Sequence, residues 1–438
     1  MANLSWKYPE PGLLIRAIVL IYLALVPTLV LAQPLDRFLE AADQTNLDVQ
    51  LGAANAARTS AESGQVWGGL LPAVTVAGAF VRNQVETSID VPTGPTTSDT
   101  ITIAKLNQLD LSVRVEVPLI DVNRWLQTAG ALASERAAGL RAAATRTQVR
   151  REVVVAYYAA AAAQALLATG AESLVVAQAQ LRQQQARGEA GVATELERVR
   201  AEAEVQRTEQ VLTDARALDA NARRTLFSLT GLMAEAFPSL APDDLQAEPP
   251  ISELEGNLSS LSAVRATEED ASGARRTAAA AVAALFPRVD AQFTQRFTNA
   301  TGFAGQGALW NAGVNLSWRL DAPGVQGLRA ANARADIAAL TAAKARLAAA
   351  DQLHADWVRT SAAASKLKAA QSQVVSSRRA AALAGERQGA GVGTQLELIS
   401  ADRDHLQAQV NAILARYELA SARATLQLGA NRDLEATR

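Results

Sequence analysis

Few side chains in this sequence have types and spacings suited to chemistry. The 438 residues include two histidines and no cysteine. His354 and His405 are far apart in sequence and form no metalloprotease pattern, so we interpret each as a partly exposed helix residue. The lack of cysteine excludes disulfides, thiolate metal sites, a cysteine nucleophile and a lipid carried on an N-terminal cysteine. No serine, histidine and aspartate grouping suggests hydrolysis. We therefore predict no enzyme, no catalytic residue, no metal site and no cofactor.

Two glycine-rich stretches resemble phosphate-binding loops only superficially. GVGTQ (391–395) lacks the lysine and the preceding strand that such a loop requires. GFAGQG (302–307) lies between two predicted strands, where a flexible surface loop explains its composition better than nucleotide binding does. We predict that neither stretch binds a nucleotide.

The first of these stretches belongs to a turn that is written twice. AGVATELE (190–197) recurs as AGVGTQLE (390–397), and each matching pair is 200 positions apart (391 minus 191). Glycine permits the backbone angles that reverse a chain, and threonine can cap a following helix through its hydroxyl group. Each copy therefore predicts a tight turn between two antiparallel helices, formed by Gly191, Val192 and Thr194 in one copy and by Gly391, Val392 and Thr394 in the other.

Composition limits the possible partners and the shape of the chain. Forty-two basic and 44 acidic residues give a formal charge of −2, so no basic excess is present to bind nucleic acid along its phosphates. Hydrophobic residues make up 49% of the chain, but many of them are alanine. Alanine favours helices and close backbone approach while filling little core volume, which suits thin layers of long helices.

The first 32 residues have the order of a secretory signal peptide. Lys7 and Arg16 precede the apolar run AIVLIYLALVPTLVLA, which ends in small residues at Ala32. We predict cleavage after Ala32 rather than an uncleaved anchor, because the apolar run is short and contains Pro27. No later apolar run reaches about 18 residues, so we expect no transmembrane helix in the exported chain, and any membrane is crossed by strands.

The exported chain contains the same series of elements twice. We expect a first repeat over 33–236, a linker over 237–250 and a second repeat over 251–438. In the first repeat a helix runs from 35 to about 67, strands cover 73–80 and 109–117, and a helical hairpin covers 122–187 and 194 to about 229. The stretch SIDVPTGPTTSDT between the strands is rich in turn formers and predicts a long solvated loop.

The second repeat follows this order again. A helix begins at Ser252, strands lie around 289–297 and 310–320, and a helical hairpin has its long arm at 327–385. All four strands alternate apolar and polar residues, which predicts one apolar and one polar face. The residues that we expect to face lipid are Val74, Val76, Phe80, Val113, Val115, Phe293, Phe297, Trp310, Val314, Leu316 and Trp318.

Four such strands cannot close a barrel within one chain. Strands that span a membrane must form a closed barrel, because free edges would leave backbone groups unpaired in lipid. Three chains would supply twelve strands, an even number within the range of outer-membrane barrels. Two alternatives are a periplasmic coiled-coil scaffold with soluble hairpins and a stand-alone porin. The export signal and the matched duplication favour the shared barrel.

At this point the chain resembles the TolC family of outer-membrane efflux proteins. The resemblance rests on LEAADQTNLDVQ and LLP before the first strand, PLID after the second, LFP before the third, and two helix-turn-helix hairpins in the same order. It implies an α+β membrane protein that is a homotrimer, with a twelve-stranded β-barrel in outer-membrane lipid and a helical α-barrel across the periplasm. It further implies a channel for efflux or type I secretion that works with an inner-membrane transporter.

The family also implies roles for the duplicated turns. The two hairpin tips are where a periplasmic adaptor (membrane fusion) protein docks, which assigns docking to the six residues of the turns named above. Acidic residues after the second tip form a periplasmic gate in the family. Glu397 occupies the first of these positions, but Ser400 stands at the second. A solvated helix face is the alternative interpretation of Glu397.

Overall fold

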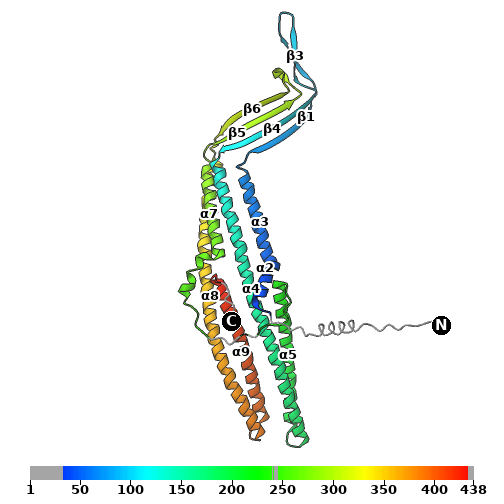
Figure 1. Ribbon diagram of the computed structural model, residues 1–438, viewed down its shortest axis with the longest axis vertical. Coiled ribbons are helices and arrows are strands. Elements are labelled where there is room, and N and C mark those ends of the chain that lie inside the picture. Colours follow the sequence, from blue (N-terminus) through cyan, green and yellow to red (C-terminus); the bar gives the residue numbers. More distant parts are fainter. Residues whose placement is uncertain (1–32, 239, 241–244, 433–438) are drawn as a thin grey trace, which may run out of the picture.

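A computed structural model describes residues 33–238, 240 and 245–432 of the chain (Figure 1). The predicted signal peptide and its cleavage site lie outside the described residues. The chain is elongated, with long helices below and a bent antiparallel sheet at one end. The two hairpin tips lie together at the opposite end. The molecule is thus a rod with a sheet at one end and helical turns at the other.

The helices of the first half confirm the predicted hairpin. The helices are α2 (Leu35–Thr45), α3 (Leu47–Gly68), α4 (Val122–Glu189) and α5 (Glu195–Thr230). The single helix that we expected from 35 to 67 is wrong at Asn46, where the backbone is extended and the side chain caps α3 by accepting from Asp48 N. Asparagine does this readily at a helix start. The hairpin turn is shorter than expected, because Gly188 still lies inside α4.

The second half has the same long elements. It contains α6 (Ile251–Glu255), a short 3₁₀ turn η1 (Leu258–Ser260), α7 (Ser262–Ala283), α8 (Ala322–Gly389) and α9 (Gln395–Gly429). Helix α8 begins five residues before the predicted start at 327, because Asp321 caps it by accepting from Gly324 N at 2.9 Å. Asp121 caps α4 in the same way. Both long helices have 68 residues, a length of about 100 Å.

The main sheet has four antiparallel strands in the order β1-β4-β5-β6. The strands are β1 (Ala73–Arg82), β4 (Asn107–Ile120), β5 (Arg288–Thr298) and β6 (Ala308–Ser317), with a 3₁₀ turn η2 (Gly302–Ala304) before β6. Trp318 was expected within the last strand but lies one residue beyond it. Its indole Nε1 donates to Leu285 O at 2.9 Å. Strands β1 and β6 form the two edges of the sheet.

The long loop predicted between the first two strands of the main sheet is wrong. That stretch forms a second hairpin of β2 (Thr87–Pro92) and β3 (Ser98–Ala104), which extends beyond the main sheet (Figure 1). Its apolar residues alternate, and Ile89 lies opposite Ile101. The turn formers instead occupy the tip, where Thr93 N donates to Thr97 O at 2.8 Å. Turn-rich composition therefore marked the tip of a hairpin and not the whole connection.

The helices next to the sheet follow the order of its strands. Helix α3 packs against α4, α4 against α7, and α7 against α8. Each of these helices leads directly into or out of a strand of the main sheet. One edge of the molecule is therefore β1 with α3, and the opposite edge is β6 with α8.

The largest buried core lies midway along the rod. The ring of Phe38 packs against Tyr157, with ring centroids 5.5 Å apart, and stacks on Phe237, with ring centroids 6.4 Å apart. Burial raises the pKa of Tyr157, and its hydroxyl donates to Gln33 O at 2.9 Å. Among the described helices, α4 alone is apolar and long enough to span a membrane, but 56% of that apolar window is buried inside the chain. Helix α4 is therefore the central packing helix of the rod.

Candidate functional site: hairpin tips and sheet faces

The two duplicated turns have the same backbone conformation. Gly191 has φ +73° and Gly391 has φ +74°, a region that favours glycine. Val192 N donates to Arg187 O at 2.9 Å, and Val392 N donates to Arg387 O at 3.0 Å. The glycine thus reverses the chain at the end of each long helix, as the sequence predicted.

The returning helices begin with matching capping boxes. Glu197 N donates to Thr194 Oγ1 at 3.3 Å, and the Glu197 carboxylate accepts from Thr194 N at 2.7 Å. In the second tip the corresponding distances between Thr394 and Glu397 are 3.2 and 3.4 Å. These reciprocal bonds satisfy backbone donors that would otherwise be free at a helix start. The two threonines therefore cap their helices, and each glutamate completes the box.

Apolar side chains are exposed at both tips. Val192 is 64% exposed and Val392 is 71% exposed. Leu196 and Leu396, which follow the capping threonines, are also more than half exposed. Sequence reasoning did not assign Leu196 and Leu396 to the docking surface, although their repetition in TELE and TQLE was a usable signal. Each tip therefore presents two large apolar side chains at its surface.

The structure places Glu397 in a local role. Its carboxylate lies on the exposed side of the second tip, within the capping box with Thr394. Glu197 is its counterpart in the first tip, where the hydrogen bond from the Thr194 backbone lowers the pKa of the Glu197 carboxyl. The Glu197 carboxyl is therefore expected to be charged at neutral pH. The cap explains why a glutamate stands here in both copies.

A buried glutamine cluster joins the two hairpins just above the tips. Gln184 and Gln388 both donate through Nε2 to Gln395 Oε1, at 2.8 and 2.7 Å. Gln184, Gln388 and Gln395 are buried, and Gln395 Nε2 has no hydrogen-bond partner. One amide oxygen therefore accepts from both hairpins.

Charged side chains continue this contact farther from the tips. Glu204 accepts from Arg207 of its own helix and from Arg403 Nε of the other hairpin, the latter at 2.8 Å. Burial alone would raise the pKa of Glu204, but the two arginines outweigh it and the pKa is lowered. Asp402 accepts from Gln180 at 2.6 Å, and burial raises its pKa. The hairpins are thus held together by specific polar contacts as well as by packing.

The cross-strand register of the main sheet separates two faces. One row runs from Val74 through Val115 and Phe293 to Ala312. The same face carries the other residues predicted to face lipid within the strands: Val76, Phe80, Val113, Phe297, Trp310, Val314 and Leu316. Of these, Trp310 stacks on Phe293 with ring centroids 6.3 Å apart. The predicted residues therefore share one face, which is apolar except for Gln295 between Val113 and Trp310.

The opposite face of the sheet is mostly polar on β4, β5 and β6, whereas β1 contributes mainly alanine to it. One of its rows runs from Thr75 through Arg114 and Thr294 to Asn311. Arg296 in the neighbouring row donates at 2.7 Å to Asp110 in the row after it, diagonally across the β4–β5 seam. A sheet with one apolar and one ion-paired face suits a wall between lipid and water.

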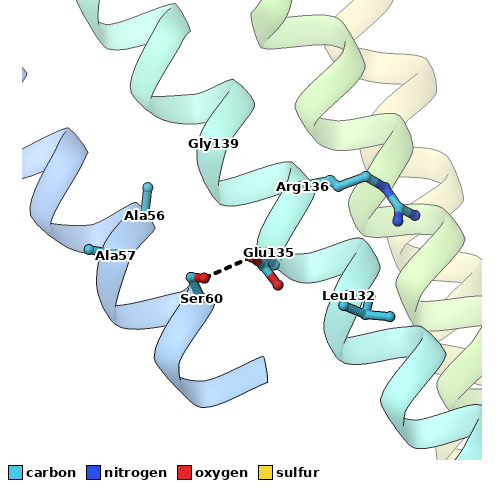
Figure 2. Close-up of a pocket in the computed structure, with 7 residues that line it drawn as sticks. All are labelled: Ala56, Ala57, Ser60, Leu132, Glu135, Arg136 and Gly139. Atoms are coloured by element: carbon cyan, nitrogen blue, oxygen red, sulfur yellow. Dashed lines mark hydrogen bonds between the residues drawn. The ribbon is translucent and has the colours of Figure 1, made fainter. Parts of the chain in front are cut away.

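A shallow groove lies between α3 and α4 (Figure 2). Its floor includes Ala56, Ala57 and Gly139, and Ser60 donates to Glu135 at 2.7 Å across it. Ser63 also donates to Glu135, so this carboxylate is already paired. Within the described residues no group of three or more His, Cys, Asp or Glu side chains could hold a metal ion. We assign no ligand to the groove.

Comparison with known proteins identifies the family. The family model described as outer membrane efflux protein matches residues 38–232 and 251–431. The chain belongs to this family. Membership makes it an outer-membrane efflux channel whose helices extend into the periplasm, and assigns it to transport rather than to a catalytic family. The sequence-based predictions of the family, of a helical fold with antiparallel strands and an internal duplication, of an efflux channel and of its outer-membrane location are confirmed.

Solved structures of similar channels share the fold. The outer-membrane channel OprN has a TM-score of 0.76 and 22% identity, with 91% of this chain and 90% of OprN covered. The CmeC outer membrane channel of Campylobacter jejuni gives 0.77 and 17%, with coverage of 90% and 85%. The outer membrane protein VceC of Vibrio cholerae gives 0.76 and 16%, with coverage of 92% and 97%. A search of curated protein sequences finds no significant match.

Proposed function

We propose that three copies of this efflux protein form one closed duct through the outer membrane and across the periplasm. The observation that carries this proposal is the four-stranded sheet, which is apolar on one face and has edge strands at β1 and β6. In lipid those edges require partners, and another copy can supply them. Three copies would give twelve strands, within the range of outer-membrane barrels.

The apolar row through Val115 and Phe293 would then face lipid, and the row through Arg114 would line the lumen. In the isolated chain Val314, Leu316 and Trp310 are 67 to 70% exposed, as expected for side chains that contact lipid acyl chains in the membrane. A periplasmic scaffold would instead expose this apolar surface to water. The duct itself does no chemistry, and its energy comes from its partners.

The hairpin tips are proposed to receive a periplasmic adaptor that links the duct to an inner-membrane transporter. Support comes from the four exposed apolar side chains at the tips, which no described part of the chain covers, together with two turns of matching shape. In a trimer the tips would form a ring of six similar turns. The residues expected to contact the adaptor are Gly191, Val192, Thr194, Gly391, Val392 and Thr394.

Glu397 is proposed to add negative charge at the tunnel mouth beyond its capping role. Three copies would bring three such carboxylates near one axis, where mutual repulsion and bound cations would influence opening. Glu397→Gln keeps a side chain that can complete the capping box and removes the charge. We expect this variant to keep its trimer and to lose cation preference in planar bilayers; an unchanged preference would remove the gate role.

Docking is tested with two substitutions of equal exposure. Val392 at the second tip and Val375 on α8 are each 71% exposed. Val392→Asp is expected to abolish efflux from cells and adaptor binding while leaving trimers intact. The matched control, Val375→Asp, is expected to leave both unchanged. If Val392→Asp supports normal efflux, the tips do not provide the docking surface; steady conductance without partners would instead favour a stand-alone porin.

A further inference from the structure

The chain contains an internal copy of the seam that would join it to its neighbour. Strands β4 and β5 join the first repeat to the second within one chain. Because the repeats match, β6 is the counterpart of β4, and β1 is the counterpart of β5. The edge β6 of one copy can therefore meet β1 of the next copy in the way that β4 meets β5.

Two fixed points align the repeats residue by residue. Pro72 and Pro287 precede β1 and β5, and they are 215 positions apart (287 minus 72). Asp121 and Asp321 cap α4 and α8 and are 200 positions apart (321 minus 121). Strand β4 has an irregularity between Pro118 and Ile120 that accommodates one extra residue. Before this bulge the separation between β4 and β6 is therefore 201 positions.

An independent pairing in the structure checks this alignment. Val74 lies opposite Val115 in the first hairpin. The alignment moves these residues to Val289 (74 to 289) and Leu316 (115 to 316), and those two residues lie opposite each other in the second hairpin. The repeats therefore superpose in register as well as in order.

We propose that β6 of one copy pairs with β1 of the next with Leu316 directly opposite Gly78. The inference rests on the closed assembly proposed above and specifies its register. It transfers the observed pair Val115 and Phe293 from the internal seam. The same transfer places Val314 opposite Phe80 and Trp318 opposite Val76. Trp318 would then have a strand partner, although the pairing of β6 with β5 ends at Ser317.

The side chains fit this register. Leu316 is 70% exposed and large, and it meets a glycine that has no side chain. Phe80 and Val314 are each more than 60% exposed and bring two apolar side chains together on the lipid face. A shift by one residue would place Leu316 opposite Ala77 or Ala79, on the polar face. The apolar pattern therefore disfavours registers shifted by an odd number of residues. Registers shifted by two residues keep the apolar face, and the experiment below distinguishes them from the proposed one.

The helices below the sheet also form an internal seam, between α4 and α7, and its counterpart between copies would join α8 to α3. The residues at these two seams differ in size. In the internal seam Gly130 and Gly273 cross so closely that a Cβ on Gly273 would lie 3.2 Å from Gly130 O. Their counterparts on α8 and α3 are Ala330 and Arg58, both exposed. The arginine cannot allow so close an approach, so the helices of neighbouring copies are expected to cross farther apart than α4 and α7 do.

Exposed apolar residues mark the same seam seven residues, or about two helical turns, farther from the sheet. Ile337 is 63% exposed and Leu51 is 60% exposed. Their counterparts in the internal seam, Ala137 and Ala266, are 0% and 1% exposed. Larger side chains thus stand where the second seam is wider, and burial of both is expected only when α8 of one copy packs on α3 of the next.

Disulfide trapping tests the register in a chain that naturally has no cysteine. The double variant Leu316→Cys with Gly78→Cys is oxidised in outer membranes and run on a non-reducing gel. Directly opposite side chains lie within about 5.5 Å and can form a disulfide, whereas diagonal neighbours lie at about 7–8 Å. Within one chain β1 and β6 are separated by two strands, so any disulfide joins two copies.

We expect a covalently linked trimer from this pair and at least tenfold less from Leu316→Cys with Val76→Cys or with Phe80→Cys. Val115→Cys with Phe293→Cys, which lie opposite within one chain, calibrates full oxidation. Val314→Cys with Phe80→Cys repeats the test without altering the glycine. If a displaced pair links best while heat-resistant trimers form, the register is wrong and the closed assembly stands. If no pair links and only monomers are found, the assembly itself is refuted.

Discussion

The two hairpin tips have the same turn but different surroundings. Leu398 and Ile399 on α9 are 8% and 4% exposed, whereas their counterparts on α5 are less buried: Arg198 is half-buried and Val199 is exposed. Helix α9 packs against α8 and also against α4, whereas α5 packs against α4 and, near its far end, α2 (Figure 1). The duplication therefore preserved the local turn, and packing between the hairpins made the two copies different.

The charges follow the same division. Arg198 is paired with Glu195 and Glu202 on the exposed side of α5. The counterpart of Glu202 is Asp402, which contacts Gln180 of the other hairpin. At this matched position the first copy thus has its carboxylate in an ion pair on its own helix, and the second copy uses its carboxylate in a contact between hairpins. The comparison predicts that equivalent substitutions will have unequal effects.

The largest effect is expected from exchanging the residue types at one matched position. Leu398→Arg would bury a charge without a partner and should destabilise the chain by about 3 kcal/mol. Arg198→Leu removes only an exposed ion pair and should leave stability unchanged. Thermal unfolding of both variants in detergent, followed by circular dichroism, measures the difference. Equal midpoints would show that the tips have equivalent surroundings.

A medium effect, equal in the two copies, is expected at the caps. Thr194→Ala and Thr394→Ala each remove the hydroxyl that accepts from a backbone N–H, at a cost of about 1 kcal/mol. Thr→Ser at the same positions keeps the hydroxyl and serves as the control. Hydrogen exchange of the first turn of α5 and α9 should rise in both alanine variants; a rise in only one would mean that the capping boxes differ in strength.

The smallest effect is a pH-dependent gain at Asp402. Burial raises the pKa of this carboxyl above its unfolded value, so its charged form costs stability at neutral pH and the cost disappears as pH falls through that pKa. Gln180, His405 and Glu204 are the neighbouring polar groups. Asp402→Asn should therefore stabilise the chain by less than about 1 kcal/mol at pH 7, with no gain below about pH 4. Glu202→Gln, the matched change at the exposed ion pair with Arg198, serves as the control.

The sequence predicted what depends on local pattern. Period-two alternation located all four strands of the main sheet and their apolar face, and the repeated AGVxTxLE placed both tips. It missed Asn46, because a polar residue within a helical pattern can lie on a surface or cap a new helix. It took β2 and β3 for a loop, since proline and glycine at the tip outweighed the alternating Ile89 and Ile101. The buried Gln395 was also missed, because only the second hairpin makes that site buried.

At Trp318 the sequence pattern predicted more strand than the single chain forms. Alternation placed it in a strand, and the single chain ends the strand one residue earlier, where pairing with β5 ends at Ser317. Strand length depends on the partner as well as on the sequence. The proposed neighbour would supply such a partner on the other edge of β6, and the alternation in the sequence would then describe the assembled sheet.

The most direct test of the account is the mass of the native particle extracted from outer membranes in mild detergent. Native mass spectrometry, with the denatured chain measured in parallel, counts the copies independently of shape. The account predicts a particle of three mature chains that resists heating and dissociates only on full denaturation. A soluble periplasmic monomer, or a membrane particle with any other number of chains, would contradict it.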